Sequence, residues 1–128
     1  MRRLRILLAE DDAVISGLVA EILANLGHDV CDVARTESDA IEAAARHEPD
    51  LMIVDAYLQD GSGVVAMKAI LRHIAMPHIF MTGGSRQFIP PQATVLYKPF
   101  GKAALVAALE SVAGQIASRA KGAAHAQP

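Results

Sequence analysis

The chain has 128 residues, of which 52% are hydrophobic and 20% charged, and its formal net charge is -2. This length fits one domain, and the composition is too apolar for a disordered chain. The scarcity of aromatic residues, with no Trp, two Tyr and three Phe, argues against base stacking, and the negative charge argues against nucleic acid as a partner. Lone Cys31 cannot form an internal disulfide and is interpreted as a small core residue.

The basic start of the chain, Arg2-Arg3-Leu4-Arg5, resembles the charged region of a signal peptide. However, Glu10, Asp11 and Asp12 interrupt the apolar stretch that follows, which is then too short for a signal core or a membrane span. We therefore expect a cytoplasmic protein that does not insert into a membrane.

The first half of the chain predicts alternating strands and helices. In order, we expect a strand at residues 6–9, a helix with apolar positions from 14 to 26, a strand at 30–33 and a helix ending near His47. Asp12 is the expected N-cap of the first helix and Gly27 its stop. Thr36 and Asp39 resemble a capping box for the second helix.

The second half continues this pattern with one interruption. In order, we expect a strand at residues 51–54, a helix after the loop 60–63, a strand at 78–81, a strand at 94–97 and a last helix from Lys102. The strand at 51–54 has no polar alternation, which places it in the middle of a sheet covered by helices on both faces. Glycine and proline pairs make the segment between the last two strands poor in helix signal, so we expect a shortened or irregular fourth helix there and a mobile segment from Gly83 to Gln92.

Five strands with intervening helices predict right-handed crossovers and an α/β fold with a doubly wound parallel sheet. We assign residues 1–120 to one domain and residues 121–128 to a flexible C-terminal tail, because the tail is small and polar. The last helix carries an apolar stripe that predicts a face packed on the core, formed by Leu105, Leu109, Val112 and Ile116.

Polar groups stand at the carboxyl ends of four predicted strands. Glu10 and Asp11 follow the first strand, Asp55 the third, Thr82 the fourth and Lys98 the fifth. The carboxyl ends of parallel strands share one edge of the sheet, so these side chains are expected to meet in a crevice. Clustered carboxylates need a counter-charge, and Mg²⁺ takes carboxylate and phosphate oxygens as ligands. The pattern therefore indicates metal-assisted phosphoryl chemistry.

The order of these landmarks resembles a response-regulator receiver domain over nearly the whole chain. The similar motifs are Glu10-Asp11-Asp12, Asp50 to Asp55, Asp60-Gly61-Ser62-Gly63, Thr82-Gly83 and Lys98-Pro99-Phe100. The resemblance implies a flavodoxin-like, or CheY-like, sheet with the strand order 2-1-3-4-5. Residues 80–84, Phe-Met-Thr-Gly-Gly, are also similar to the motif of the so-called FATGUY receivers, a branch associated with unusual fourth helices and stand-alone proteins.

The resemblance implies a role for each site residue. Asp55 would accept a phosphoryl group from the phosphohistidine of a sensor histidine kinase or a histidine phosphotransfer protein. Asp11, Asp55 and the backbone carbonyl of Tyr57 would bind Mg²⁺ directly, with Glu10 acting through a coordinated water. Lys98 would pair with the phosphoryl oxygens from the other side.

The resemblance also implies a switch beside the acceptor. Thr82 would donate its hydroxyl to a phosphoryl oxygen, and Gly83 would leave space beside it. Pro99 would help to place Lys98, and family members commonly carry this proline after a cis peptide bond. Val95 departs from the family, in which a Tyr or Phe at this position usually swings inward as the Thr moves.

We therefore expect a single-domain response regulator that signals and is not a classical enzyme. It would take up a phosphoryl group with Mg²⁺, lose it by self-catalysed hydrolysis, and bind a downstream protein target or serve as a phosphate sink. One alternative is a pseudo-receiver interaction module that works without phosphorylation. The intact acids, Thr82 and Lys98 argue against it, whereas Val95 and the altered fourth helix keep it open. Another is a Mg²⁺-dependent phosphatase with Asp55 as nucleophile, but Tyr57 stands where its general acid Asp is usually found.

Overall fold

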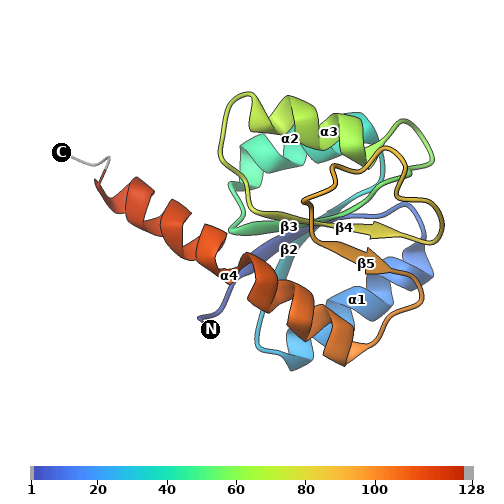
Figure 1. The fold of residues 1–128 in the computed structure, drawn as a ribbon, viewed down its shortest axis with the longest axis horizontal. Coiled ribbons are helices and arrows are strands. Elements are labelled where there is room, and N and C mark those ends of the chain that lie inside the picture. The colour runs from blue at the N-terminus through green and yellow to red at the C-terminus, as the bar shows by residue number, and fades with distance from the viewer. Residues whose placement is uncertain (1, 126–128) are drawn as a thin grey trace.

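The computed structural model describes residues 2–125, in which strands and helices alternate with one exception. Figure 1 shows the elements β1 (Arg5–Ala9), α1 (Ala13–Asn25), β2 (Asp29–Ala34), α2 (Glu37–His47), β3 (Leu51–Asp55), α3 (Gly63–Leu71), β4 (His78–Thr82), β5 (Val95–Tyr97) and α4 (Lys102–His125). The five strands form one sheet in the order β2-β1-β3-β4-β5, and every neighbouring pair is parallel. The predicted fold and strand order are confirmed.

Helices cover both faces of the sheet. In Figure 1, α2 and α3 lie on one side of the strands, and α1 and α4 lie on the other. β3 is buried on both sides: Met52 and Val54 pack in the layer with α2 and α3, while Leu51 and Ile53 pack in the layer with α1 and α4. This confirms the central position predicted from its unbroken apolar sequence.

The predicted caps fix where the helices begin. Asp12 Oδ1 accepts hydrogen bonds from the amides of Val14 at 2.9 Å and Ile15 at 3.2 Å, so it is the N-cap of α1. Thr36 Oγ1 accepts from the Asp39 amide at 3.1 Å at the start of α2. These bonds satisfy amides that have no partner within the helix.

The exception to the alternation is the connection between β4 and β5. Residues 83–94 are all described, and they contain no helix. The prediction of an altered fourth helix is therefore confirmed. Val95 is half-buried in the layer with α2 and α3, whereas Tyr97, two residues along the same strand, is 52% exposed.

The last helix packs by the predicted stripe. Leu105, Leu109, Val112 and Ile116 are all buried. α4 continues to His125, so residues 121–125 are helical although the sequence assigned them to the tail, and the rest of that tail lies outside the described residues. Among residues 2–125, no helix combines the length and the apolar character needed to cross a bilayer.

Candidate functional site

Three carboxylates and one lysine meet at the carboxyl edge of the sheet. Glu10, Asp11 and Asp55 each offer an oxygen, and these atoms all lie within 4.8 Å of one another. The Lys98 ammonium donates hydrogen bonds to Glu10 Oε1 and to Asp55 Oδ2. The side chains that the sequence placed at separate strand ends therefore share one site.

The sheet register explains this convergence. β1 and β3 are neighbours with Ala9 opposite Val54, so Glu10 and Asp55 leave their strands at the same height. Lys98 follows β5, where its amide donates to the Thr82 carbonyl at 2.8 Å. The Lys98–Pro99 peptide bond is cis.

Burial sets the electrostatics of the site. Glu10 and Asp55 are only 1% and 6% exposed. Burial raises the pKa of Glu10 to about 7, although the hydrogen bond from Lys98 opposes this rise. Burial alone would lower the pKa of Lys98, but its hydrogen bonds to Asp55 and Glu10 outweigh that effect and raise it. The Lys98 ammonium thus pairs with two of the three clustered carboxylates, and the cluster still carries more acidic than basic groups.

The donor set fits a hard divalent cation. Carboxylate oxygens from Glu10, Asp11 and Asp55 are the ligands that Mg²⁺ prefers, and Asp11 is half-buried and open to solvent. The Tyr57 amide donates to Asp55 Oδ1 at 2.9 Å, which ties the loop after β3 to the Asp55 carboxylate. Asp12 stands apart in function, because its side chain caps α1.

Thr82 lies beside this cluster, fully buried at the end of β4. Its hydroxyl donates to the Ser85 carbonyl at 3.3 Å and accepts from the Gly84 amide at 3.2 Å. A Cβ added at Gly83 would lie 4.0 Å from Lys98 Cβ, which is ordinary van der Waals contact. In this arrangement a small side chain would therefore fit at residue 83 without a clash.

The structure adds positioning residues that the sequence did not single out. A Cβ added at Gly63 would lie 1.8 Å from the Asp55 carbonyl oxygen, so only glycine lets α3 begin against the acceptor. Glu37 Oε1 accepts the Ser62 amide at 2.9 Å and holds the same loop from α2. The glycine-rich loop was a visible signal for Gly63, but nothing in the sequence links Glu37 to a residue 25 positions away.

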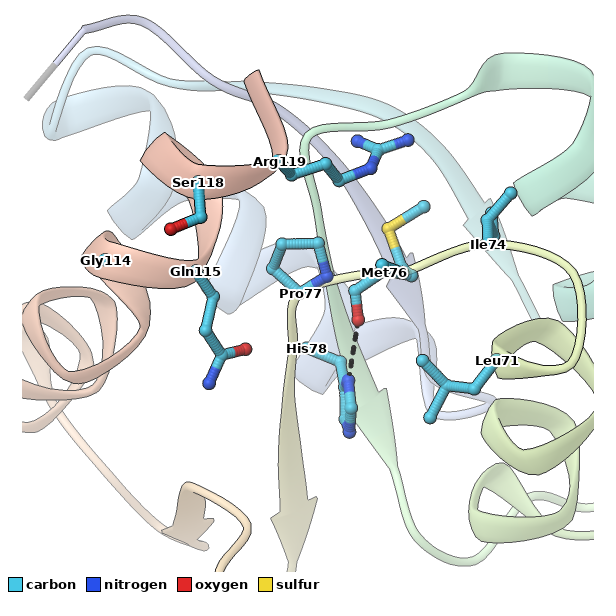
Figure 2. Close-up of a pocket in the computed structure, with 10 residues that line it drawn as sticks. Leu71, Ile74, Met76, Pro77, His78, Gly114, Gln115, Ser118 and Arg119 are labelled. Carbon is cyan, nitrogen blue, oxygen red and sulfur yellow. Dashed lines mark hydrogen bonds between the residues drawn. The ribbon is translucent and has the colours of Figure 1, made fainter. Parts of the chain in front are cut away.

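A separate hollow lies at the opposite end of the strands. It has a volume of about 960 Å³ and lies between α4 and the segment that joins α3 to β4 (Figure 2). Two of its polar side chains already have partners: His78 Nδ1 donates to the Met76 carbonyl at 2.8 Å, and Arg119 donates to the Pro49 carbonyl at 2.8 Å. It is lined by no carboxylate, so the acidic edge is the better candidate site.

Comparison with known proteins agrees with this geometry. Residues 6–110 match the response regulator receiver domain. The chain belongs to that family. A relative, the phyllosphere-induced regulator PhyR of Methylorubrum extorquens, is 35% identical over 101 residues, which cover 74% of this chain and 38% of PhyR. The transcriptional regulatory protein PdtaR of Mycobacterium tuberculosis is 31% identical over 112 residues, covering 83% of this chain and 55% of PdtaR.

Solved structures show the same receiver fold. The anti-anti-sigma factor PhyR from Bartonella quintana superposes with a TM-score of 0.79 at 28% identity, covering 97% of this chain and 52% of that chain. The receiver thus spans about half or less of the length of these relatives. Receiver domains are components of two-component signalling, and this chain is one of them.

Proposed function

We propose that this receiver accepts a phosphoryl group on Asp55 from the phosphohistidine of a sensor kinase or a phosphotransfer protein. A carboxylate oxygen of Asp55 forms a bond to phosphorus while the bond from phosphorus to the histidine nitrogen breaks. The product aspartyl phosphate is later hydrolysed in the same site. The observation that carries this proposal is the meeting of Asp55 with Glu10, Asp11 and Lys98 at one edge of the sheet.

Mg²⁺ is the cofactor that this donor set fits. Asp11, Asp55 and the Tyr57 carbonyl would hold it, with Glu10 acting through a water. When bound, it neutralises phosphoryl oxygens during in-line transfer. Since burial raises the Glu10 pKa, a cation near this carboxylate also offsets the cost of its negative charge.

Two side chains of the protein, those of Lys98 and Thr82, would contact the phosphoryl oxygens. The Lys98 ammonium already touches the acceptor carboxylate, so it can stay close to the phosphoryl oxygens after transfer. Thr82 is the last residue of β4 and follows Met81, which pairs with Asp55, so its hydroxyl could turn from the Ser85 carbonyl to a phosphoryl oxygen on Asp55. This exchange would change how residues 83–94 are held.

We propose that the signal leaves through binding of a protein target. The receiver's relative from Bartonella quintana is named an anti-anti-sigma factor, which is a role in protein binding. A phosphate sink for a shared kinase is the other use of the same chemistry.

The test is phosphorylation of the full chain by acetyl phosphate and by candidate kinases, followed by mass spectrometry. Wild type should gain one phosphoryl group only with Mg²⁺, and Asp55→Asn should gain none. Asp12→Asn is the matched control: it changes the neighbouring acid, but Asn is also a good N-cap, so labelling should persist.

Two results would count against the proposal. Full labelling of Asp55→Asn would show that another residue is the acceptor. A wild-type protein that stays unlabelled with every donor, although Mg²⁺ binds, would favour the pseudo-receiver alternative.

A further inference from the structure

A groove lies between α3 and the irregular segment 83–94, close to the acceptor. We call it the α3–loop groove; its volume is about 400 Å³, and its walls include Tyr57, Val65, Lys68, Phe88 and Ile89. Figure 1 shows the segment from β4 to β5 running past α3 without forming a helix. The groove exists because no helix fills this position.

The walls of the groove leave apolar side chains uncovered. Phe88 is 66% exposed, and Tyr57 and Val65 are each 48% exposed, whereas Ile89 is buried and anchors the segment in the core. Three large exposed apolar side chains around one concave surface are typical of an interaction site.

The charge of the residues that line the groove indicates the chemistry of its partner. Thirteen of the fourteen Asp and Glu residues stand at or before residue 60, and the other is Glu110. Besides Lys98 and Lys102, the stretch between contains exposed Lys68 on α3, exposed Arg72 directly after α3, and Arg86 in the loop. Lys68 is the charged residue that lines the groove. A partner with acidic side chains therefore complements this surface.

Ser85 connects the groove to the acceptor site. Its carbonyl accepts from the Thr82 hydroxyl at 3.3 Å and from the Tyr57 hydroxyl at 3.5 Å, and its own hydroxyl accepts from the Gln87 amide at 3.0 Å, next to Phe88. The Thr82 hydroxyl has one proton, so donating it to a phosphoryl oxygen removes it from Ser85. Tyr57, which lines the groove, therefore shares the Ser85 carbonyl with Thr82.

We propose that the α3–loop groove is a docking surface for an acidic amphipathic helix of a partner protein. Apolar side chains of that helix would pack on Phe88 and Val65, and a carboxylate would face Lys68. Phosphorylation changes the affinity by drawing the Thr82 hydroxyl away from Ser85; this second part rests on the proposed function. A protein segment is favoured over nucleic acid, because the walls are apolar and only one of their residues is basic.

The experiment uses a synthetic helical peptide with two leucines and a glutamate on one face, and a matched peptide with lysine in place of the glutamate. Binding to the full chain is measured by fluorescence anisotropy, before and after acetyl phosphate with Mg²⁺. Phe88→Ala and Lys68→Glu test the groove. Tyr97→Ala and Lys102→Glu are matched controls, because they change an exposed aromatic and an exposed lysine elsewhere.

We expect the acidic peptide to bind at least tenfold more weakly to Phe88→Ala and Lys68→Glu, and within twofold of wild type to both controls. Its affinity should change at least threefold on phosphorylation. Phosphorylation of every variant at Asp55 would show that each is folded and that the acceptor works.

Different results would overturn the docking surface, the coupling through Ser85, the choice of partner and the proposed function. Equal binding of both peptides, or equal binding to groove and control variants, would overturn the docking surface and leave the proposed function standing. An affinity that is identical in the phosphorylated and unphosphorylated protein would overturn the coupling through Ser85. Tighter binding of a single-stranded oligonucleotide than of the acidic peptide would overturn the choice of partner. Failure of Asp55 to take a phosphoryl group would instead overturn the proposed function, and the unphosphorylated chain would still decide the docking surface.

Discussion

The connections that follow β3 and β4 leave the same edge of the sheet and border the same carboxylates, yet they are held in different ways. The first, residues 56–62, is tied to distant parts of the chain: Ser62 bonds to Glu37, the Glu37 amide donates to the Asp60 carbonyl at 3.0 Å, and Gly63 packs against Asp55. Its geometry is therefore fixed by the neighbouring helix and strand.

The second connection, residues 83–94, is held largely by itself. Arg86 donates to the carbonyls of Pro90 at 3.0 Å and Pro91 at 3.1 Å, and the Ile89 amide donates to the Arg86 carbonyl at 3.0 Å. Its links to the rest of the fold are few: the side chain of Ile89, hydrogen bonds from the Thr82 and Tyr57 hydroxyls to Ser85, and one from the Phe80 amide to the Thr94 carbonyl. The comparison teaches that Asp55 adjoins a connection fixed by distant parts of the chain, while residues 83–94 have few long-range contacts.

The largest effect is expected for Gly63→Ala, which would break the rigid loop. The new Cβ would meet the Asp55 backbone, and no side-chain rotation relieves a clash with backbone, so stability should fall by about 3 kcal/mol or more. Urea unfolding would measure the loss of stability, and acetyl phosphate labelling would measure the loss of phosphorylation. As a control, Gly17→Ala in α1 has open space around it and should stabilise the protein by about 0.5–1 kcal/mol. A Gly63→Ala protein with wild-type stability would show that the close approach is absent in solution.

A smaller loss is expected for Glu37→Ala, which unties the same loop from α2. The Ser62 amide loses a charged acceptor, which should cost about 1–2 kcal/mol and weaken Mg²⁺ binding several-fold. Glu37→Gln keeps an acceptor oxygen for the Ser62 amide and should recover most of the affinity for Mg²⁺. Denaturation and Mg²⁺ titration would be compared with Glu42→Ala on the exposed side of the same helix. Equal losses at residues 37 and 42 would contradict the positioning role.

Arg86→Ala should affect the second connection locally. Because its hydrogen bonds lie within residues 83–94, global stability should change by less than about 1 kcal/mol. Hydrogen exchange of those residues should accelerate, while residues 56–62 stay as in wild type. Arg86→Lys should restore part of the protection, because one guanidinium nitrogen donates both bonds and an ammonium also carries several donors. Strong protection of residues 83–92 in the unphosphorylated wild type would also refute their predicted mobility.

The smallest expected effect is a change in the pH dependence of stability through His28. This residue lies at the opposite edge of the sheet from the connections 56–62 and 83–94. Burial lowers the pKa of His28, whose Nδ1 accepts the Leu4 amide at 3.1 Å and must be neutral to do so. A folded-state pKa below the unfolded value gives stability that is complete above about pH 6.5 and is lost as the pH falls below it. Unfolding free energies between pH 7.5 and 5.5 should therefore fall less for His28→Gln than for wild type. Parallel curves would show that His28 is not responsible.

Much of the site was predictable because its signals are local. The acids after two apolar runs, the threonine after a third and the Lys-Pro pair after a fourth needed only the rule that parallel strands end at one edge. The roles of Asp12 as a helix cap and of the last helix's apolar stripe were predicted in the same way and are confirmed. The assignments of Asp55 as acceptor and of the Tyr57 carbonyl as a metal ligand stay predictions.

The amino-acid sequence by itself determined the α/β alternation, the central strand and the set of groups at the acidic edge, because these depend on hydrophobic period and on residues next to strand ends. Only the tertiary structure decided that Glu37 holds the acceptor loop, that Gly63 touches the Asp55 backbone and that Ser85 lies between Thr82 and Tyr57. These are contacts between segments whose approach depends on how helices pack on the sheet, and no periodicity within the chain encodes them.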